Sequence, residues 1–173
     1  MKTYKTILFT SNLSETSRQA FTHAAALARG FGSKIVLLHV IDQMPGQLQY
    51  RISMLFGESR WNEILQAHMQ EARRSLAGKV SSKQLIQVAL NAFCDDEGVS
   101  ASGSGTAAHE IVIKEGEVVK TILEQSELSH CDVIVMGASK GLLSGTAVGN
   151  HIKSVLKGAR VPVLVVPPVR SSA

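Results

Sequence analysis

The sequence alternates short apolar runs with stretches of helical periodicity, and this alternation limits the fold more than any other feature of the chain. The apolar runs are rich in β-branched residues and short enough to be single buried strands. They predict strands at residues 4–11, 34–42, 110–116, 132–137 and 161–168. The stretches between them predict helices at 15–32, 58–78, 82–93, 117–130 and 150–159, of which 82–93 is either a separate helix or a continuation of 58–78. Strands that alternate with helices over short connections are typical of a parallel sheet.

We therefore expect an α/β fold, with a single domain over residues 1–173, a doubly wound, five-stranded parallel sheet and helices on both faces. If the strand order is 3-2-1-4-5, that order reverses between the first and fourth strands. Ligands of such sheets bind beyond the carboxyl ends of the strands at the reversal. The loop after the first strand, SNLSE, and the loop after the fourth, within residues 136–150, would then face one crevice.

Local signals refine this outline at three places. Ser14 is predicted as a plain N-cap, because Ser17 stands where a capping box has Glu or Gln, and Gly30 is a plausible end of the same helix. Residues 43–57 are interpreted as a polar, turn-rich connection. Residues 94–109 are predicted as a flexible surface loop, because their Gly, Ser and Ala content offers little apolar area to offset backbone ordering.

The composition narrows the class of function. There are 18 Lys and Arg residues against 14 Asp and Glu, but the basic residues are scattered, which does not indicate a nucleic-acid surface. Cys94 and Cys131 have neither metal-ligand spacing nor the pattern of a disulfide framework. No apolar stretch reaches the roughly 18–20 residues of a membrane span, and the apolar run near the N-terminus is too short for a secretory signal. We therefore expect a cytoplasmic protein that binds neither nucleic acid nor membranes.

The loop at residues 136–150 carries four glycines between an apolar strand and a helix. Backbone N–H groups in such a turn, followed by a helix N-terminus, form a ready anion site. A glycine-rich loop can equally serve only to turn the chain, so both interpretations stay open. The dinucleotide fingerprint and the P-loop pattern are both absent, and no residues resemble a general base beside a nucleophile.

Four segments of the chain resemble the universal stress protein family. They are KTILFTSNLSETSRQAFTHAAALA, KIVLLHVID, IVIKEGEVVKTILEQSELSHCDVIVMGASKG and GNHIKSVLKGARVPVLVVPP, and they cover most of the chain outside residues 43–108. The pairing of DVIVMG with VPVLVV across a glycine loop and a helix is fairly specific. The resemblance implies the strand order 3-2-1-4-5, a homodimer and, in one branch of the family, ATP bound in the crevice.

The nucleotide-binding branch of the family is similar in this loop to G-x-x-G-x9-G-[ST]. Gly137 matches the first glycine, and Lys140 stands at the place of the second, with Gly141 after it. Gly149 comes one residue early, and Asn150 replaces the Ser or Thr. We therefore expect weak binding of ATP, with magnesium, and at most slow hydrolysis.

The loop after the first strand also departs from the family, because Asn12 stands for the usual Asp and Leu13 for the usual Gly. The resemblance implies that Asn12 and Val40 lie near the ribose and adenine, and that the phosphates lie at the N-terminus of the helix 150–159. The candidate nucleotide-binding residues are thus Asn12, Val40, Gly137, Lys140, Gly141, Gly149 and Asn150.

Two functions remain open on the sequence, because the missing acid–base constellation counts against a third, an enzyme of the wider adenine-nucleotide-binding α/β superfamily. The first is a dimeric, adenine-nucleotide-binding regulator of the stress response, and the second is a ligand-free dimeric interaction protein of the same family. In both, the homodimer is expected to form through the last strand, Val161–Val166, because an apolar sheet edge is usually covered or paired. Pro162 removes only one backbone donor from that strand. His39, inside the second strand, is expected to be a core histidine rather than a catalytic one.

Overall fold

A parallel sheet is the centre of the computed structural model, which describes residues 3–42, 47–73, 81–99, 109–138 and 149–169. Over these residues the sheet has five strands in the order β3-β2-β1-β4-β5, and every neighbouring pair is parallel. The strands are β1 (Thr6–Ser11), β2 (Lys34–Ile41), β3 (His109–Glu115), β4 (Val133–Gly137) and β5 (Val163–Val166). The predicted fold class and the strand order 3-2-1-4-5 are confirmed.

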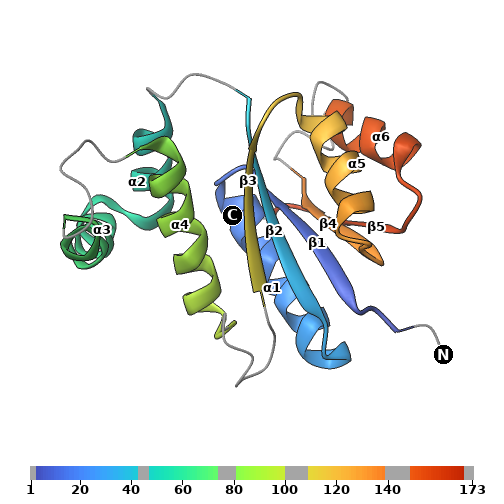
Figure 1. Cartoon of the computed structure of the whole chain (residues 1–173), viewed down its shortest axis with the longest axis horizontal. Helices are drawn as coiled ribbons and strands as arrows, with labels where there is room; N and C mark the ends of the chain where they lie inside the picture. Colours follow the sequence, from blue (N-terminus) through green and yellow to red (C-terminus); the bar gives the residue numbers. More distant parts are fainter. Residues whose placement is uncertain (1–2, 43–46, 74–80, 100–108, 139–148, 170–173) are drawn as a thin grey trace.

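Helices cover both faces of the sheet, as predicted (Figure 1). One face carries α1 (Glu15–Phe31) and α4 (Ser82–Asp96), and α2 (Leu48–Phe56) and α3 (Glu58–Arg73) pack against α4. The other face carries α5 (Val118–Leu128) and α6 (Gly149–Gly158). The reversal of strand order lies between β1 and β4, where we expected it.

Strand β1 shows why the strands are continuous apolar runs in the sequence. Ile7 and Phe9 belong to the apolar cluster beneath α1 and α4, whereas Leu8 belongs to the cluster beneath α5 and α6. All three are fully buried, as expected for a parallel strand with helices on both sides. On the α1 side, the ring of Phe9 lies 5.0 Å from that of Phe21, which in turn lies 6.2 Å from that of Phe93. These ring contacts join β1, α1 and α4.

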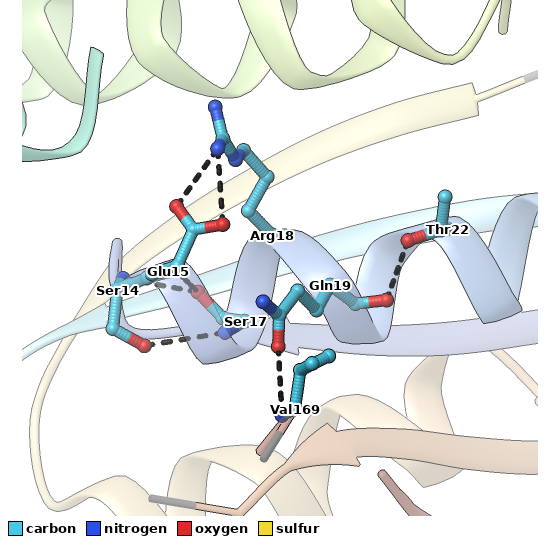
Figure 2. Close-up of polar contacts among 7 residues, drawn as sticks. All are labelled: Ser14, Glu15, Ser17, Arg18, Gln19, Thr22 and Val169. Carbon is cyan, nitrogen blue, oxygen red and sulfur yellow. Dashed lines mark hydrogen bonds and ion pairs between the residues drawn. The ribbon is translucent and has the colours of Figure 1, made fainter. Parts of the chain in front are cut away.

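The first turn of α1 contains a complete capping box, so the prediction of a plain N-cap is wrong. The Ser14 hydroxyl accepts a hydrogen bond from the Ser17 N–H at 3.2 Å, and the Ser17 hydroxyl accepts one from the Ser14 N–H at 3.1 Å (Figure 2). A serine can take the place of Glu here because the Ser17 hydroxyl lies close enough to accept from the backbone N–H of the N-cap residue. The helix ends at Gly32 rather than Gly30, because Gly32 adopts the left-handed φ of 65° and its N–H donates to the carbonyl of Ala28.

Helix α2 was not predicted, because the segment 43–57 was interpreted as a polar connection. The structure places a helix over Leu48–Phe56, whereas residues 43–46 lie outside the described residues. Ile52 and Phe56 are buried and Leu48 packs against the same cluster, which is the i, i+4, i+8 spacing of one helix face. Burial of this apolar face outweighs the polar composition of the segment.

The prediction of a flexible loop over residues 94–109 is wrong for residues 94–99. Helix α4 continues to Asp96, and Cys94 and Val99 are buried in the core. Residues 100–108 lie outside the described residues. Helix α4 also has its own capping box, formed by Ser81 and Gln84, so it is a separate helix rather than a continuation of α3.

The cysteines behave as buried apolar side chains. Burial raises the pKa of Cys94 to about 12 and that of Cys131 to about 11, so both thiols stay protonated at neutral pH. Among the helices of the described residues, none has the length and apolar character needed to cross a membrane.

Candidate functional site

The candidate site is the point where the strand order reverses. Thr10 of β1 pairs with Met136 of β4, so the two strands end at the same edge of the sheet. On the other side of β1, Ser11 pairs with His39 of β2. Asn12 follows Ser11 and Val40 follows His39, so these two residues are also neighbours across the strands. In Figure 1 this edge lies at the top of the sheet, with α2 and α6 on opposite sides of it. The structure thus brings together the loop after β1, the end of β2 and the end of β4.

The loop from β1 to α1 is held by its own polar groups. The Ser11 hydroxyl accepts from the Leu13 N–H at 3.0 Å, and Asn12 Oδ1 accepts from both the N–H and the hydroxyl of Ser14. Leu13 has a φ of 55°, a conformation that is a clear outlier for a bulky residue. It is retained because the Leu13 side chain is 2% exposed and packs in the core beneath α1. The loop therefore has little freedom to move.

Asn12 keeps both N–H donors of its side-chain amide for a ligand. Its side chain is exposed, and within the described part of the chain its amide nitrogen makes no hydrogen bond. Val40 is half-buried and packs against the cluster beneath α5 and α6, where it offers an apolar wall. These two predicted site residues lie together, as the register of β1 and β2 requires.

Arg51 is a site residue that the sequence analysis missed. It lies on α2, and its Nη2 donates a 2.6 Å hydrogen bond to the backbone carbonyl of Asn12. It is exposed, and in the residues that the structure describes it has no carboxylate within ion-pair distance. Finding it from the sequence would have required recognising the apolar spacing of α2, because only that helix brings Arg51 to the loop.

His39 is a buried, neutral side chain beneath this loop. Its Nδ1–H donates to the carbonyl of Ser11 at 2.8 Å, and the residue is 7% exposed. Burial, aided by the charge of Arg51, lowers the pKa of His39 to about 4, although the Ser11 carbonyl and Asp42 act in the opposite direction. The expectation of a core histidine is confirmed.

Gly137 allows β4 and α1 to approach each other closely. A Cβ at this position would lie 2.8 Å from the backbone carbonyl oxygen of Thr16, in the first turn of α1. Neither backbone can move aside without disturbing the sheet, so no larger residue fits. Gly137 therefore determines how near the N-terminus of α1 lies to the end of β4.

Gly149 and Asn150 form the first turn of α6, so the helix starts one residue earlier than predicted. A Cβ on Gly149 would lie 2.6 Å from Cε and 3.1 Å from Nζ of Lys153. The Lys153 side chain therefore folds back over the start of its own helix, as side chains on helices tend to do. Asn150 is exposed, whereas Lys140 and Gly141 lie outside the described residues.

The N-terminus of α6 and the Lys153 ammonium together form a candidate anion-binding site. The first N–H groups of a helix have no partner within it and carry partial positive charge, and Lys153 adds a full charge beside them. Lys153, like Arg51, has no carboxylate within ion-pair distance among the described residues.

We expect an added methyl group to destabilise the protein much more at Gly137 than at Gly149. Gly137→Ala should lower the free energy of unfolding by about 1–3 kcal/mol, because its Cβ meets the Thr16 backbone. Gly149→Ala should change it by less than about 1 kcal/mol, because its Cβ meets only the flexible Lys153 side chain. Urea unfolding of both variants measures the difference, and equal losses would contradict the close approach at Gly137.

We also expect His39 to make stability depend on pH. Its pKa is lower in the folded state than its ordinary value of 6.5, so the unfolded chain binds more protons between about pH 6.5 and 4. This contribution is complete above pH 6.5 and is lost as the pH falls toward 4, by about 3 kcal/mol in all. Urea unfolding at pH 7 and pH 4.5 should show a smaller pH effect in His39→Gln than in the wild type. The exposed control His23→Gln should keep the wild-type effect, and an unchanged pH effect in His39→Gln would refute the assignment.

Comparisons with known proteins agree with this geometry. A model described as the universal stress protein family matches residues 3–167. Universal stress protein MJ0577 of Methanocaldococcus jannaschii is 27% identical over 94% of this chain and 94% of its own length. An Arabidopsis thaliana protein of the same family, solved with AMP bound, has a TM-score of 0.57 at 18% identity over 95% of this chain and 92% of its own. A universal stress protein in complex with cAMP has a TM-score of 0.56 at 15% identity over 95% and 98%.

At these identities, the two solved structures show a shared fold and nothing more. The family match is broader, because residues 3–167 include all five described strands and both loops of the candidate site. This chain belongs to the universal stress protein family.

Proposed function

We propose that this protein is an adenine-nucleotide-binding regulatory module of the cytoplasmic stress response, working as a homodimer and binding ATP weakly. The observation that carries the proposal is Lys153, whose side chain folds back over the N-terminus of α6, the helix that follows β4. A helix N-terminus with an adjacent cation is best suited to bind a phosphate group. Two structural relatives were solved with AMP and cAMP, which supports an adenine nucleotide as the ligand.

The candidate residues form two regions, one for the phosphates and one for the ribose and adenine. The N–H groups of Gly149 and Asn150, with Lys153, would bind the phosphates, and magnesium would accompany ATP through those phosphates. The Asn12 amide would donate to the ribose or the base, and Val40 would cover the adenine with an apolar surface. Gly137 contributes indirectly, because it brings the start of α1 close to the site.

We expect weak affinity for ATP because of the hydrogen bonds and the charge of Asn12. Its Oδ1 is already bonded to Ser14, and it has no negative charge to offer a ribose hydroxyl. One lost charge-assisted hydrogen bond is worth about 1.5–3 kcal/mol, which is roughly a ten- to two-hundred-fold loss of affinity. We therefore place the dissociation constant for ATP in the micromolar range or above.

Calorimetry with magnesium and ATP tests the proposal. The wild type should bind in that range, and Lys153→Ala should weaken binding about tenfold or more, because a cation beside the phosphates is removed. Lys157→Ala is the matched control: it removes a lysine from the last turn of the same helix and should leave the affinity unchanged.

No heat at millimolar ATP would overturn nucleotide binding and leave the ligand-free interaction protein as the better function. Equal effects of Lys153→Ala and Lys157→Ala would show that the N-terminus of α6 does not bind the phosphates.

The proposed dimer uses the free edge of the sheet. Strand β5 pairs only with β4 in the described sheet, so its other side presents backbone N–H and C=O groups. Leu164 is 38% exposed, and Val163 and Val165 are half-buried. An apolar edge strand of this kind favours pairing with an identical strand about a two-fold axis, here through Val161–Val166.

Light scattering at micromolar concentration should give the mass of a dimer for the wild type. Leu164→Lys should shift the protein to a monomer, because a charge on an edge strand opposes strand pairing. Leu128→Lys, at a leucine that is 66% exposed at the end of α5, should leave the dimer intact. A monomeric wild type would contradict the proposed interface.

A further inference from the structure

A hollow lies between α2 and the loop that follows β1. It has a volume of about 280 Å³ and is lined chiefly by Leu13 and Glu15 on one side and by Tyr50, Arg51, Met54 and Leu55 of α2 on the other. We call it the α2 groove. None of the candidate nucleotide-binding residues lines it.

The α2 groove combines exposed apolar side chains with a cation that has no anionic partner. Tyr50 is 67% exposed and Met54 is 68% exposed, four residues apart on the same side of a helix. Exposed aromatic and Met side chains around a concave surface are typical of binding sites rather than of solvated helices.

The charges of the groove favour an anion. Glu15 is neutralised by Arg18, whose Nη2 lies 2.9 Å from its carboxylate (Figure 2). Arg60 and Arg160 are likewise paired with carboxylates. Arg51 differs from these three, because in the part of the chain that the structure describes it donates to a neutral carbonyl and has no ion-pair partner. That bond holds the guanidinium in place and leaves its other N–H groups for a ligand.

The groove is continuous with the candidate site through Asn12. Arg51 donates to the Asn12 carbonyl, and the next residue, Leu13, lines the groove. The groove therefore borders the loop that carries Asn12, and Arg51 contacts both.

The volume of the groove limits its occupant to part of a ligand. Sites for whole small molecules are about 300–1,000 Å³, so the α2 groove suits one ring system rather than a complete nucleotide. A planar ring can stack on Tyr50 and contact the Met54 thioether. A phosphate next to that ring would meet Arg51.

From these features we propose that the α2 groove extends the nucleotide site and binds the second base of a dinucleotide, whose linking phosphates contact Arg51. The inference rests on the proposed function, because the first nucleotide occupies the site beside Asn12 and α6. It makes dinucleotides with a phosphate bridge, rather than mononucleotides, the preferred class of ligand.

Calorimetry of the full chain with ATP and with di(adenosine-5′) tetraphosphate tests this inference. The dinucleotide should bind at least about tenfold more tightly than ATP. Tyr50→Ala should remove that advantage while leaving the affinity for ATP within about twofold, and Tyr50→Phe should retain the advantage because it keeps the ring. Leu128→Ala, at an exposed leucine outside the groove, is the control and should behave as the wild type.

The outcomes separate the two proposals. If ATP binds and the dinucleotide binds no more tightly, the dinucleotide inference is overturned and the proposed function stands. If Tyr50→Ala keeps the advantage, the second base does not bind in the α2 groove, and the inference is again overturned. If neither ligand binds, both proposals are overturned; binding of ATP by the Tyr50 variants shows that they are folded.

Discussion

The close contact between the end of β4 and the first turn of α1 is the constraint on which the site depends. Gly137 permits it, because any side chain there would strike the Thr16 carbonyl at 2.8 Å. The Ser14–Ser17 capping box then fixes the start of the helix, and the hydrogen bonds of Ser11 and Asn12 close the loop before it. A rigid junction of this kind positions Asn12 without help from a ligand, and a preorganised site loses less entropy on binding.

The chemistry of the site comes from cations placed around that rigid junction. Lys153 lies over the N-terminus of α6, and Arg51 approaches Asn12 from α2, on the far side of the loop. Neither is neutralised by a carboxylate within the described residues, so both keep their charge for an anionic ligand. Asn12 adds no negative charge beside these cations, which supports the proposal of an anionic ligand. Two separated cations favour a ligand with several phosphates, as proposed above.

The sequence predicted the sheet well and the site only in part, for physical reasons. The central strands β1, β2 and β4 are apolar on both faces, so their pattern is strong, and the strand order follows from the family resemblance. Helix α2 was missed because its apolar face consists of a few residues in a polar segment, and its formation depends on burial of Ile52 and Phe56 against distant elements. Arg51 was missed for the same reason, since its contact with Asn12 spans 39 positions in the chain. Lys153 could have been noticed, because its position four residues after Gly149 places it over the helix start.

Native mass spectrometry of the purified protein measures the mass of the assembly and of any bound ligand together. We expect a homodimer that carries the mass of adenine nucleotide, either as purified or after incubation with millimolar ATP and magnesium. A monomer with no added mass under both conditions would contradict it.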